Sequence, residues 1–434
     1  MDHRMNWKPG IVALALGCLV QTAARAETDQ DAEQQVGPPP GRKIIPSREP
    51  PPAGVHRIGS FKVYPEIVVS EMYDDNIYAT QTNRVSDSAT ILSPAVWLQS
   101  DWSRHVLKFE AGAESTRYHS QTSQNSNDFR YSMEGRYDFS QDMNAYAGLS
   151  RSMEHEDRES PDFRNGFYPT EFRSTKGYAG WYGQHGRLGV RVGGTMQSLD
   201  FNNVPFTFGV INNRDRNRIH QTGGIRLSYE FSTDKELYLQ AAVDQRRYQN
   251  KPDDAGYSRD SNGERLLAGS KIMLPGKLKA DFFFGHMSQR YQDVRLSKVS
   301  APMFGARIDW RPAPSTLLGF YLDRTIEETT VFQTIPVVLP ASSYVNSYAA
   351  LTAEHKLNDR LSVNANLTYS RNDFKGFSRI DNYAGVGLGA VYQISRGIFL
   401  DSSFQHRWMR STSTLENFDR NLLFVRIAFA LSPS

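Results

Sequence analysis

The sequence is poor in three features that would place a chain of 434 residues in a common protein class. It has a single cysteine, Cys18. It has no apolar run of about 18 residues, the length that a membrane-spanning helix requires. Its formal net charge is only +3 and no basic run stands out. We therefore expect neither a helical membrane span nor a nucleic-acid partner.

The N-terminus has the features of a secretory signal. Basic residues precede the short apolar stretch 11–20, and Ala24-Arg25-Ala26 matches a cleavage site. We therefore predict a signal peptide over residues 1–26. Cys18 lies inside it, in a poor match to a lipoprotein box, so acylation of Cys18 is the minor alternative. If the signal is removed, the mature chain has no thiol, which excludes disulfides, thiolate metal sites and cysteine nucleophiles.

Residues 27–60 are acidic and glutamine-rich at first and then proline-rich. Such a composition cannot form a packed core, so we predict an extended, disordered periplasmic lead-in. It is interpreted as a spacer, with a tether or partner-docking arm as the alternative. The barrel described next is predicted to occupy residues 61–434.

Strict alternation of apolar and polar residues dominates the chain after residue 60. Between Leu361 and Ser370, for example, every odd position is apolar and every even position is polar. This period of two belongs to a strand, because a helix has a period of 3.6. Repeated long strands of this kind predict an all-β fold, a transmembrane antiparallel up-and-down β-barrel of about 18 strands. The predicted strands are 61–72, 89–101, 104–118, 127–139, 142–155, 170–183, 186–200, 217–231, 235–249, 257–273, 277–291, 301–311, 315–328, 343–356, 360–373, 380–394, 397–410 and 418–431.

The connections between these strands alternate in length. Short turns, such as Trp102-Ser103, Gln184-His185 and Asn358-Asp359, are separated by longer polar segments. The longer segments include 74–88, 156–169, 201–216 and 329–342. Bacterial outer-membrane barrels have short periplasmic turns and longer outer loops. The alternation therefore predicts that both termini lie in the periplasm of a Gram-negative cell.

Charged residues recur at the centres of the predicted strands, always on the polar face. An arginine or lysine facing lipid at mid-depth costs roughly 2–4 kcal/mol, so this face must line a wet interior. Mixed signs predict weak ion selectivity; cross-strand pairing that merely stabilises the wall is the alternative for each residue. The predicted pore-lining residues are Lys108, Glu110, Glu114, Arg130, Glu134, Arg136, Arg187, Arg191, Arg226, Glu230, Tyr238, Asp244, Asp281, Arg307, Asp309, Arg407 and Arg426. The arginines are expected to hold acidic sugars, and Tyr238 to stack on sugar rings.

Several motifs resemble the beta-barrel porin 2 family of outer-membrane proteins. The barrel opens with Gly-Ser-Phe-Lys-Val-Tyr-Pro at 59–65 and continues with Ser-Glu-Met-Tyr-Asp-Asp-Asn at 70–76. Ser-Asp-Trp-Ser-Arg-His follows at 100–105, and more diffuse similarity extends over the rest of the barrel. The resemblance implies an outer-membrane conduit, and members of the family are often linked to exopolysaccharide export.

No sequence motif indicates catalysis, so we predict no enzyme, no catalytic residue and no cofactor. Two acidic clusters could ligate a metal. Residues 153–159 contain histidine and carboxylates, but a solvated loop rim is the preferred interpretation. Residues 73–76 could bind a hard cation such as Ca²⁺, but an Asx-rich loop entry is preferred. We therefore predict no metal site.

We expect an aqueous conduit that exports exopolysaccharide across the outer membrane. A structural or lipid-modifying barrel with a plugged lumen is the alternative. The expected partners are outer-membrane lipid, lipopolysaccharide, the barrel-assembly machinery and periplasmic polysaccharide-export components. Many outer-membrane proteins end on an aromatic residue that the barrel-assembly machinery recognises. Here Phe429 or Leu431 is the last outward-facing apolar residue of the final predicted strand, and the tail Ser432-Pro433-Ser434 follows it.

Overall fold

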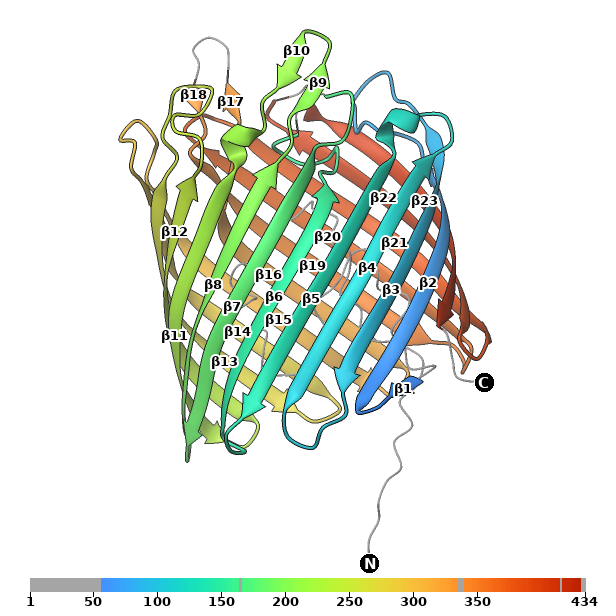
Figure 1. Cartoon of the computed structure of the whole chain (residues 1–434), viewed down its shortest axis with the longest axis vertical. Helices are drawn as coiled ribbons and strands as arrows, with labels where there is room; N and C mark the ends of the chain where they lie inside the picture. Colours follow the sequence, from blue (N-terminus) through green and yellow to red (C-terminus); the bar gives the residue numbers. More distant parts are fainter. Residues whose placement is uncertain (1–55, 164–165, 334–338, 414–415, 431–434) are drawn as a thin grey trace, which may run out of the picture.

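A single closed β-barrel makes up most of the molecule (Figure 1). The computed structural model describes residues 56–430, except for 164–165, 334–338 and 414–415. Eighteen antiparallel strands form the wall, and β2 closes the barrel by pairing with β23. These strands are β2 (Phe61–Asp74), β3 (Asp87–Ser100), β4 (Val106–Tyr118), β5 (Ser126–Asp138), β6 (Met143–His155), β7 (Glu171–His185), β8 (Leu188–Phe201), β11 (Arg218–Ser232), β12 (Lys235–Tyr248), β13 (Ser261–Leu274), β14 (Leu278–Tyr291), β15 (Val299–Ala313), β16 (Thr316–Glu328), β19 (Ser343–Lys356), β20 (Leu361–Lys375), β21 (Ile380–Ser395), β22 (Ile398–Ser411) and β23 (Phe418–Ala430).

The predicted fold class is confirmed, and each predicted strand overlaps one strand of the wall. The barrel begins earlier than predicted. Strand β1 (His56–Ile58) falls within the predicted lead-in 27–60, yet it pairs with the start of β2. The sheet therefore begins before residue 61. The predicted signal peptide and the rest of the lead-in lie outside the described residues.

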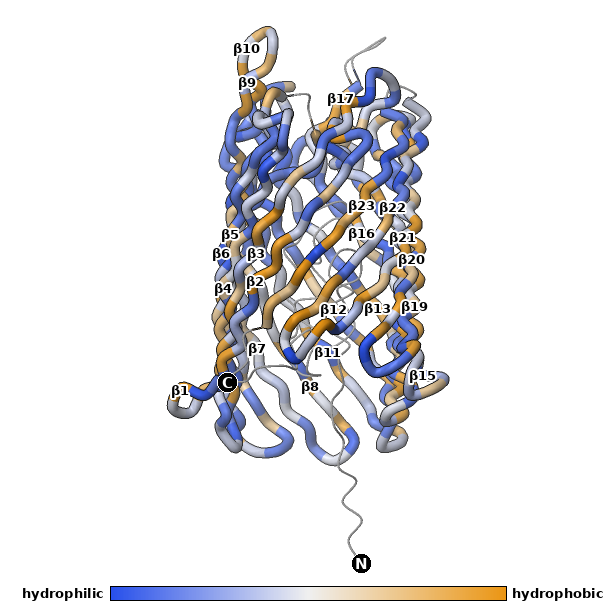
Figure 2. Tube along the Cα trace, turned by 90° about the vertical axis from the view of Figure 1, so that its right-hand side faces the viewer, coloured by the Kyte–Doolittle hydropathy of each residue, from blue (hydrophilic) through white to orange (hydrophobic). Residues whose placement is uncertain are grey.

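The two faces of the wall differ as the alternation requires. Along β12, Leu239 and Val243 are exposed on the outside, whereas Tyr238, Ala242 and Asp244 are buried on the inside. Figure 2 shows apolar residues recurring along the strands of the wall. Large apolar side chains exposed on other strands include Leu149, Val192, Leu227, Leu266, Phe284, Leu351, Leu367, Leu388, Phe404 and Val425. The outer face is thus an apolar belt suited to lipid.

Glycines in the middle of β6 and β7 make room for two inward-facing tyrosines. Tyr146 lies opposite Gly180, and Tyr178 lies opposite Gly148. A methyl group built on either glycine would overlap the tyrosine ring opposite it. The rings therefore lie flat against the wall, where a side chain on the neighbouring strand would otherwise stand.

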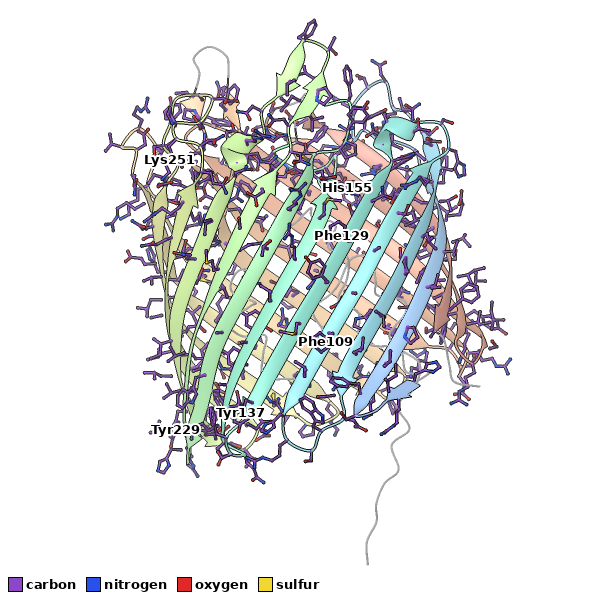
Figure 3. The ribbon with its side chains drawn as sticks, viewed as in Figure 1. Phe109, Phe129, Tyr137, His155, Tyr229 and Lys251 are labelled. Carbon is purple, nitrogen blue, oxygen red and sulfur yellow. The ribbon has the colours of Figure 1, made fainter. Side chains whose placement is uncertain are left out.

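The two ends of the barrel are built differently. Strand β1 and the end of β23 lie at the end with short turns, where Tyr137 and Tyr229 lie near the ends of their strands (Figures 1 and 3). The opposite end carries the long connections. These contain the short elements η2 (Thr122–Gln124), β9 (Val204–Phe206), β10 (Gly209–Ile211), η3 (Arg214–Arg216), β17 (Phe332–Gln333) and β18 (Leu339–Pro340). No helix within the described part of the chain is long and apolar enough to cross a membrane.

Near the long-loop end, β16 separates from β15 but stays paired with β19. It pairs with β15 only as far as Asp323, which lies opposite Gly305. Beyond that point Ile326 packs among inward-facing residues of the neighbouring wall, including Met287 and Met303. Arg246 Nη2, on the inner face of β12, donates to the carbonyl oxygen of Ile326 at 3.3 Å. The upper part of β16 therefore lies inside the barrel and narrows its mouth.

Candidate functional site: the interior wall and the mouth

The predicted pore-lining residues, with one exception, lie on the inner face of the wall. Directly opposed residues on paired strands share a face, and the register links each of these positions to inward-facing neighbours. The inner-face residues are Lys108, Glu110, Glu114, Arg130, Glu134, Arg136, Arg191, Arg226, Glu230, Tyr238, Asp244, Asp281, Arg307, Asp309, Arg407 and Arg426. Whether any of them contacts a passing solute stays a prediction.

Arg187 is the exception. It lies exposed in the turn between β7 and β8 rather than in a strand. The predicted turn, Gln184-His185, is two residues too early. β7 continues to His185, and Gly186 makes the turn with a φ of +58°, a conformation that favours glycine. Arg187 is therefore at the short-turn surface and not on the pore wall.

Charges on the wall pair with close neighbours on the same or the adjacent strand. Arg426 Nη1 lies 2.6 Å from Asp401 Oδ1 on β22. Arg136 Nε lies 2.9 Å from Asp138 Oδ1, two residues further along β5. These contacts agree with the alternative interpretation, in which pairing between interior charges stabilises the wall. The interior surface still carries charges of both signs.

Arginines also cover tyrosine rings on the inner wall. The guanidinium carbon of Arg226 lies 4.0 Å from the ring centre of Tyr238, whose hydroxyl donates to Asp281 Oδ1 at 2.6 Å. Tyr238 is only 4% exposed. Stacking of a sugar on Tyr238, as expected from the sequence, therefore does not fit this arrangement, because Arg226 occupies the ring face. Arg191 and Arg307 lie over Tyr182 and Tyr321 in the same manner, at 5.1 and 5.3 Å.

Asp244 belongs to a buried cluster instead of an open wall. Its carboxylate lies 3.2 Å from Arg246 Nε, 3.6 Å from Arg265 Nη2 and 3.4 Å from His220 Nε2. The inward part of β16 adds Glu328, which pairs with Arg246. Sequence reasoning did not single out Glu328, because the inward turn of β16 has no local sequence signal.

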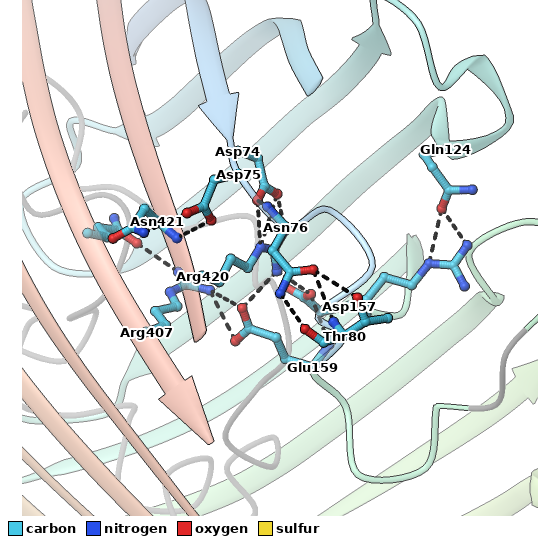
Figure 4. A network of polar contacts seen from close by, with 12 residues as sticks. Asp74, Asp75, Asn76, Thr80, Gln124, Asp157, Glu159, Arg407, Arg420 and Asn421 are labelled. Atoms are coloured by element: carbon cyan, nitrogen blue, oxygen red, sulfur yellow. Dashed lines mark hydrogen bonds and ion pairs between the residues drawn. The ribbon is translucent and has the colours of Figure 1, made fainter. Parts of the chain in front are cut away.

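The loop between β6 and β7 folds into the mouth of the barrel (Figure 4). Glu159 accepts a hydrogen bond from Arg420 Nη1 at 2.7 Å and lies 3.4 Å from Arg407 Nη1. Asp157 lies 3.3 Å from the same Arg420 nitrogen. Glu156 and Asp157 are buried. The interpretation of residues 153–159 as a solvated rim is therefore wrong for these carboxylates, since Arg407 on β22 and Arg420 on β23 hold this loop in the mouth.

The acidic start of the first long loop is held by the same arginine. Arg420 Nη2 donates to Asp74 Oδ2 at 2.6 Å, and Asn421 Nδ2 donates to Asp75 Oδ2 at 2.6 Å. The Asn76 backbone N–H donates to Asp74 Oδ1 at 2.9 Å, which forms an Asx turn. Protein donors thus take up the oxygens that a hard cation would need. Within the described ranges, no cluster of three or more His, Cys, Asp or Glu residues is placed to hold a metal ion.

Other contacts carry the β6–β7 loop across the mouth. Asp162 Oδ1 accepts hydrogen bonds from the Thr329 hydroxyl at 2.6 Å and from the Thr330 backbone N–H at 3.0 Å. Arg216, in η3, donates from Nη1 to Glu156 Oε2 at 2.9 Å. Burial alone would lower the pKa of Arg216, but the charge and hydrogen bond of Glu156 outweigh burial and raise it. The loop is thus held by the segments that follow β8 and β16 as well as by β22 and β23.

Two further arginines stabilise the loops of the mouth. Burial lowers the pKa of Arg158 to about 10, although it stays protonated at neutral pH and donates to the carbonyl oxygen of Gly166 at 3.0 Å. Arg259 is 1% exposed and donates to the carbonyl oxygens of Thr329 and Ala341 at 2.7 and 2.8 Å. Residue 259 was predicted to lie in a strand, but it precedes β13. Sequence reasoning missed both residues as parts of a site.

A closed antiparallel barrel with an apolar outer belt and a charged interior defines the class of protein. The chain is an outer-membrane β-barrel of the porin type. It belongs to the family described as "Putative beta-barrel porin 2", whose model matches residues 50–431. The family resemblance inferred from the opening motifs is thereby confirmed.

Solved structures of similar shape include outer-membrane proteins of distant sequence. OpdK from Pseudomonas aeruginosa has 10% identity and a TM-score of 0.44, over 85% of this chain and 99% of that chain. OccAB4 from Acinetobacter baumannii has 10% identity and a TM-score of 0.44, over 85% and 98%. OccK3 from P. aeruginosa has 14% identity and a TM-score of 0.43, over 85% and 96%. A search among curated proteins found no match.

Proposed function

We propose that this barrel is a passive aqueous conduit through the outer membrane, narrowed at its mouth by the β6–β7 loop, and that it is not an enzyme. The observation that carries the proposal is the loop itself. It connects β6 and β7 and is fastened by Glu159 to Arg407 on β22 and Arg420 on β23, with β2, β3, β4 and β5 lying between β23 and β6 in the wall. A loop fastened in this way sets the width of the passage, while the charged wall behind it favours water over lipid.

The cargo that we favour is an acidic exopolysaccharide leaving the cell. Its support is the family resemblance, together with interior arginines whose planar guanidinium groups suit carboxylate recognition. In this proposal the periplasmic polysaccharide-export components deliver the polysaccharide to the short-turn end of the barrel. Mixed charge on the wall favours a polymer that slides past many weak contacts over a small ion held at one strong site.

A structural barrel with a closed lumen is the second candidate. The hydrogen bonds that Thr329 and Thr330 donate to Asp162 favour this candidate, because they join the β6–β7 loop to a loop on a distant part of the mouth. Both candidates predict a narrow mouth. They differ in whether loosening the loop yields a conducting pore.

Planar-bilayer recordings of the purified full chain test the proposal. We expect small conductance steps for the wild type, and larger steps or more frequent opening for Glu159→Gln, because the neutral amide weakens the attachment to Arg407 and Arg420. Glu230→Gln is the matched control. It removes the same charge from the inner face of β11, away from the loop, and should change the conductance little.

The cargo is tested in the same recordings with two added oligosaccharides. Oligoguluronate, which carries a carboxylate on each sugar, should block the current at lower concentration than dextran oligomers of similar length. Equal block by both would reject the acidic cargo but leave the conduit intact. Absence of current in the wild type and in Glu159→Gln would reject the conduit and favour the structural barrel.

A further inference from the structure

Three arginines at the long-loop end occupy equivalent places on the outside of the barrel. Arg117, Arg247 and Arg410 are each the second-last residue of a strand, namely β4, β12 and β22. The residues just before them, Thr116, Arg246 and Met409, are buried on the inner face. Alternation therefore directs all three arginines outward, above the apolar belt.

The three side chains make the same set of hydrogen bonds. In each, Nη1 donates to two backbone carbonyl oxygens at 2.9–3.1 Å, one on the preceding residue and one on the adjacent strand. In each, Nη2 donates at 2.6–2.8 Å to a side-chain oxygen of the next residue on that strand. The side-chain acceptors are Asn127, Asn262 and Asp419, respectively.

Each of the three guanidinium groups has more N–H donors than these hydrogen bonds use. A guanidinium carries five N–H groups in a rigid plane. Three are used in each case, which leaves the Nε–H and one Nη2–H, and these point the same way from one edge of the plane. Among the described residues, none accepts a hydrogen bond from this edge of Arg117, Arg247 or Arg410. Such an edge binds a carboxylate or phosphate through two parallel hydrogen bonds.

The surroundings favour an anion. Arg117 and Arg247 have neutral asparagine partners, so each site keeps its positive charge. At the third site Arg84 Nη2 lies 3.3 Å from Asp419 Oδ2, so two guanidinium groups share one carboxylate. Further down the same face are exposed apolar side chains such as Val243 on β12 and Phe404 on β22, after an intervening polar residue, Gln245 or His406. A ligand here therefore has an acidic head above an apolar body.

We propose that Arg117, Arg247 and Arg410 form three binding sites for the phosphate groups of an anionic lipid around the outer rim of the barrel. The backbone carbonyl groups hold each guanidinium in place before the lipid arrives, which reduces the entropy lost on binding. The long-loop end of such barrels faces the cell exterior, where lipopolysaccharide supplies phosphates at this depth. The proposal depends on the membrane location and not on the conduit.

Arg290 offers a matched control. It is likewise the second-last residue of its strand, β14, and it is outward and well exposed. Among the residues that the structure describes, none offers a backbone carbonyl group to its guanidinium. The guanidinium lies 3.9 Å from the Glu264 carboxylate, which neutralises its charge. A substitution of Arg290 therefore removes a positive charge from the rim. It does not remove a guanidinium that backbone carbonyl groups hold in place with two N–H groups left for a ligand.

The experiment measures the lipopolysaccharide that remains bound to the full chain purified in mild detergent, by native mass spectrometry. The triple variant R117Q/R247Q/R410Q should retain less lipopolysaccharide than wild type by about threefold or more, because the paired donors are lost. The triple lysine variant should fall in between, since lysine keeps the charge but not the fork. R290Q should match wild type. The three single Gln variants keep the test valid if the triple variant does not fold.

Three probes identify the source of the phosphate. Delipidated protein is titrated with lipopolysaccharide, with dephosphorylated lipopolysaccharide, and with inorganic phosphate alone. We expect binding of the first only, and weaker binding by the Gln variants. Equal binding of the dephosphorylated form, or loss in R290Q equal to that in the triple Gln variant, would overturn the proposal. Saturation by inorganic phosphate with no preference for the lipid would overturn the lipid assignment.

Discussion

The wall and the mouth of the barrel use the same residue types in different ways. On the wall, Arg426 pairs with Asp401 on the adjacent strand, 25 residues away in sequence. At the mouth, Arg420 pairs with Asp157 and Glu159, more than 260 residues away. Wall contacts follow from strand register, whereas mouth contacts require the loop to cross the barrel. The mouth is therefore the part whose shape depends on a few long-range ion pairs.

This difference has consequences for stability and for motion. A wall pair is supported by the backbone hydrogen bonds of both strands, so the loss of one charge leaves the register intact. The described residues of the β6–β7 loop that cross the mouth belong to no strand and lack the paired ladder that supports the wall. The position of the loop depends on Glu156, Asp157, Glu159 and Asp162 and on their partners. Four predictions, from the largest expected effect to the smallest, test this contrast.

Arg420→Met should have the largest effect. It leaves Asp74 without its main partner and Asp157 and Glu159 without a shared one, in a region where these carboxylates are buried. Removing one member of a buried charge pair costs about 3–5 kcal/mol. Urea unfolding of the barrel in lipid vesicles measures this loss.

Arg426→Met is the wall counterpart of that variant. It leaves one carboxylate, Asp401, with its neighbours on the wall, so its cost should be smaller, about 1–3 kcal/mol. Equal losses for the two arginines would contradict the distinction between wall and mouth.

The next prediction compares the two faces of one strand. Leu149 faces lipid near the middle of β6, and Ser150 beside it faces the interior. Leu149→Arg should lower the free energy of unfolding by roughly 2–4 kcal/mol, the cost of a lipid-facing arginine at mid-depth. Ser150→Arg should cost far less, because the interior is polar. The measurement is again urea unfolding in vesicles, and similar losses from both substitutions would show that the faces are misassigned.

The wall was largely predictable from the sequence because its signal is local. A period of two over 12 or more residues identifies a strand and its faces without knowledge of any partner. This is why every predicted strand has a counterpart. Arg187 shows the limit, since a two-residue error in a turn moved it from the surface to the wall. Only the φ of Gly186 places the turn.

The mouth could not be predicted, because nothing near residues 153–159 indicates their partners. Glu159 is one acidic residue among several in a polar segment, and Arg420 is one arginine at the start of a strand. Their meeting depends on the closure of the whole barrel. The stacking of Arg226 on the Tyr238 ring is intermediate in predictability between the wall and the mouth. It follows once β11 and β12 are paired in register, with Arg226 opposite Gln240.

A third prediction concerns the space between side chains on the wall. Gly269 faces inward on β13, where a methyl group would overlap the Tyr238 ring and lie 2.6 Å from the carbonyl oxygen of Phe282. Gly269→Ala should therefore destabilise the barrel by about 1–3 kcal/mol, as overpacking does. Gly223→Ala, on the outer face of β11, meets nothing within 4 Å. It should leave the unfolding midpoint unchanged, and a loss as large as that of Gly269→Ala would point to backbone flexibility instead of crowding.

The smallest effect is expected at the short-turn end, away from both wall and mouth. Asp101 accepts a hydrogen bond from Lys62 and lies 2.6 Å from Arg57 Nη1 on β1. The hydrogen bond from Lys62, aided by the charge of Arg57, holds the pKa of Asp101 below its ordinary value of 3.8. A lowered carboxyl pKa adds stability above the unfolded value, and this stability is lost as the pH falls through the folded value. The unfolding midpoint of the wild type should therefore be slightly higher than that of Asp101→Asn at pH 7, and the difference should shrink as the pH falls below the ordinary value of 3.8. A difference that persists at acid pH would mean that the carboxylate charge is not its source.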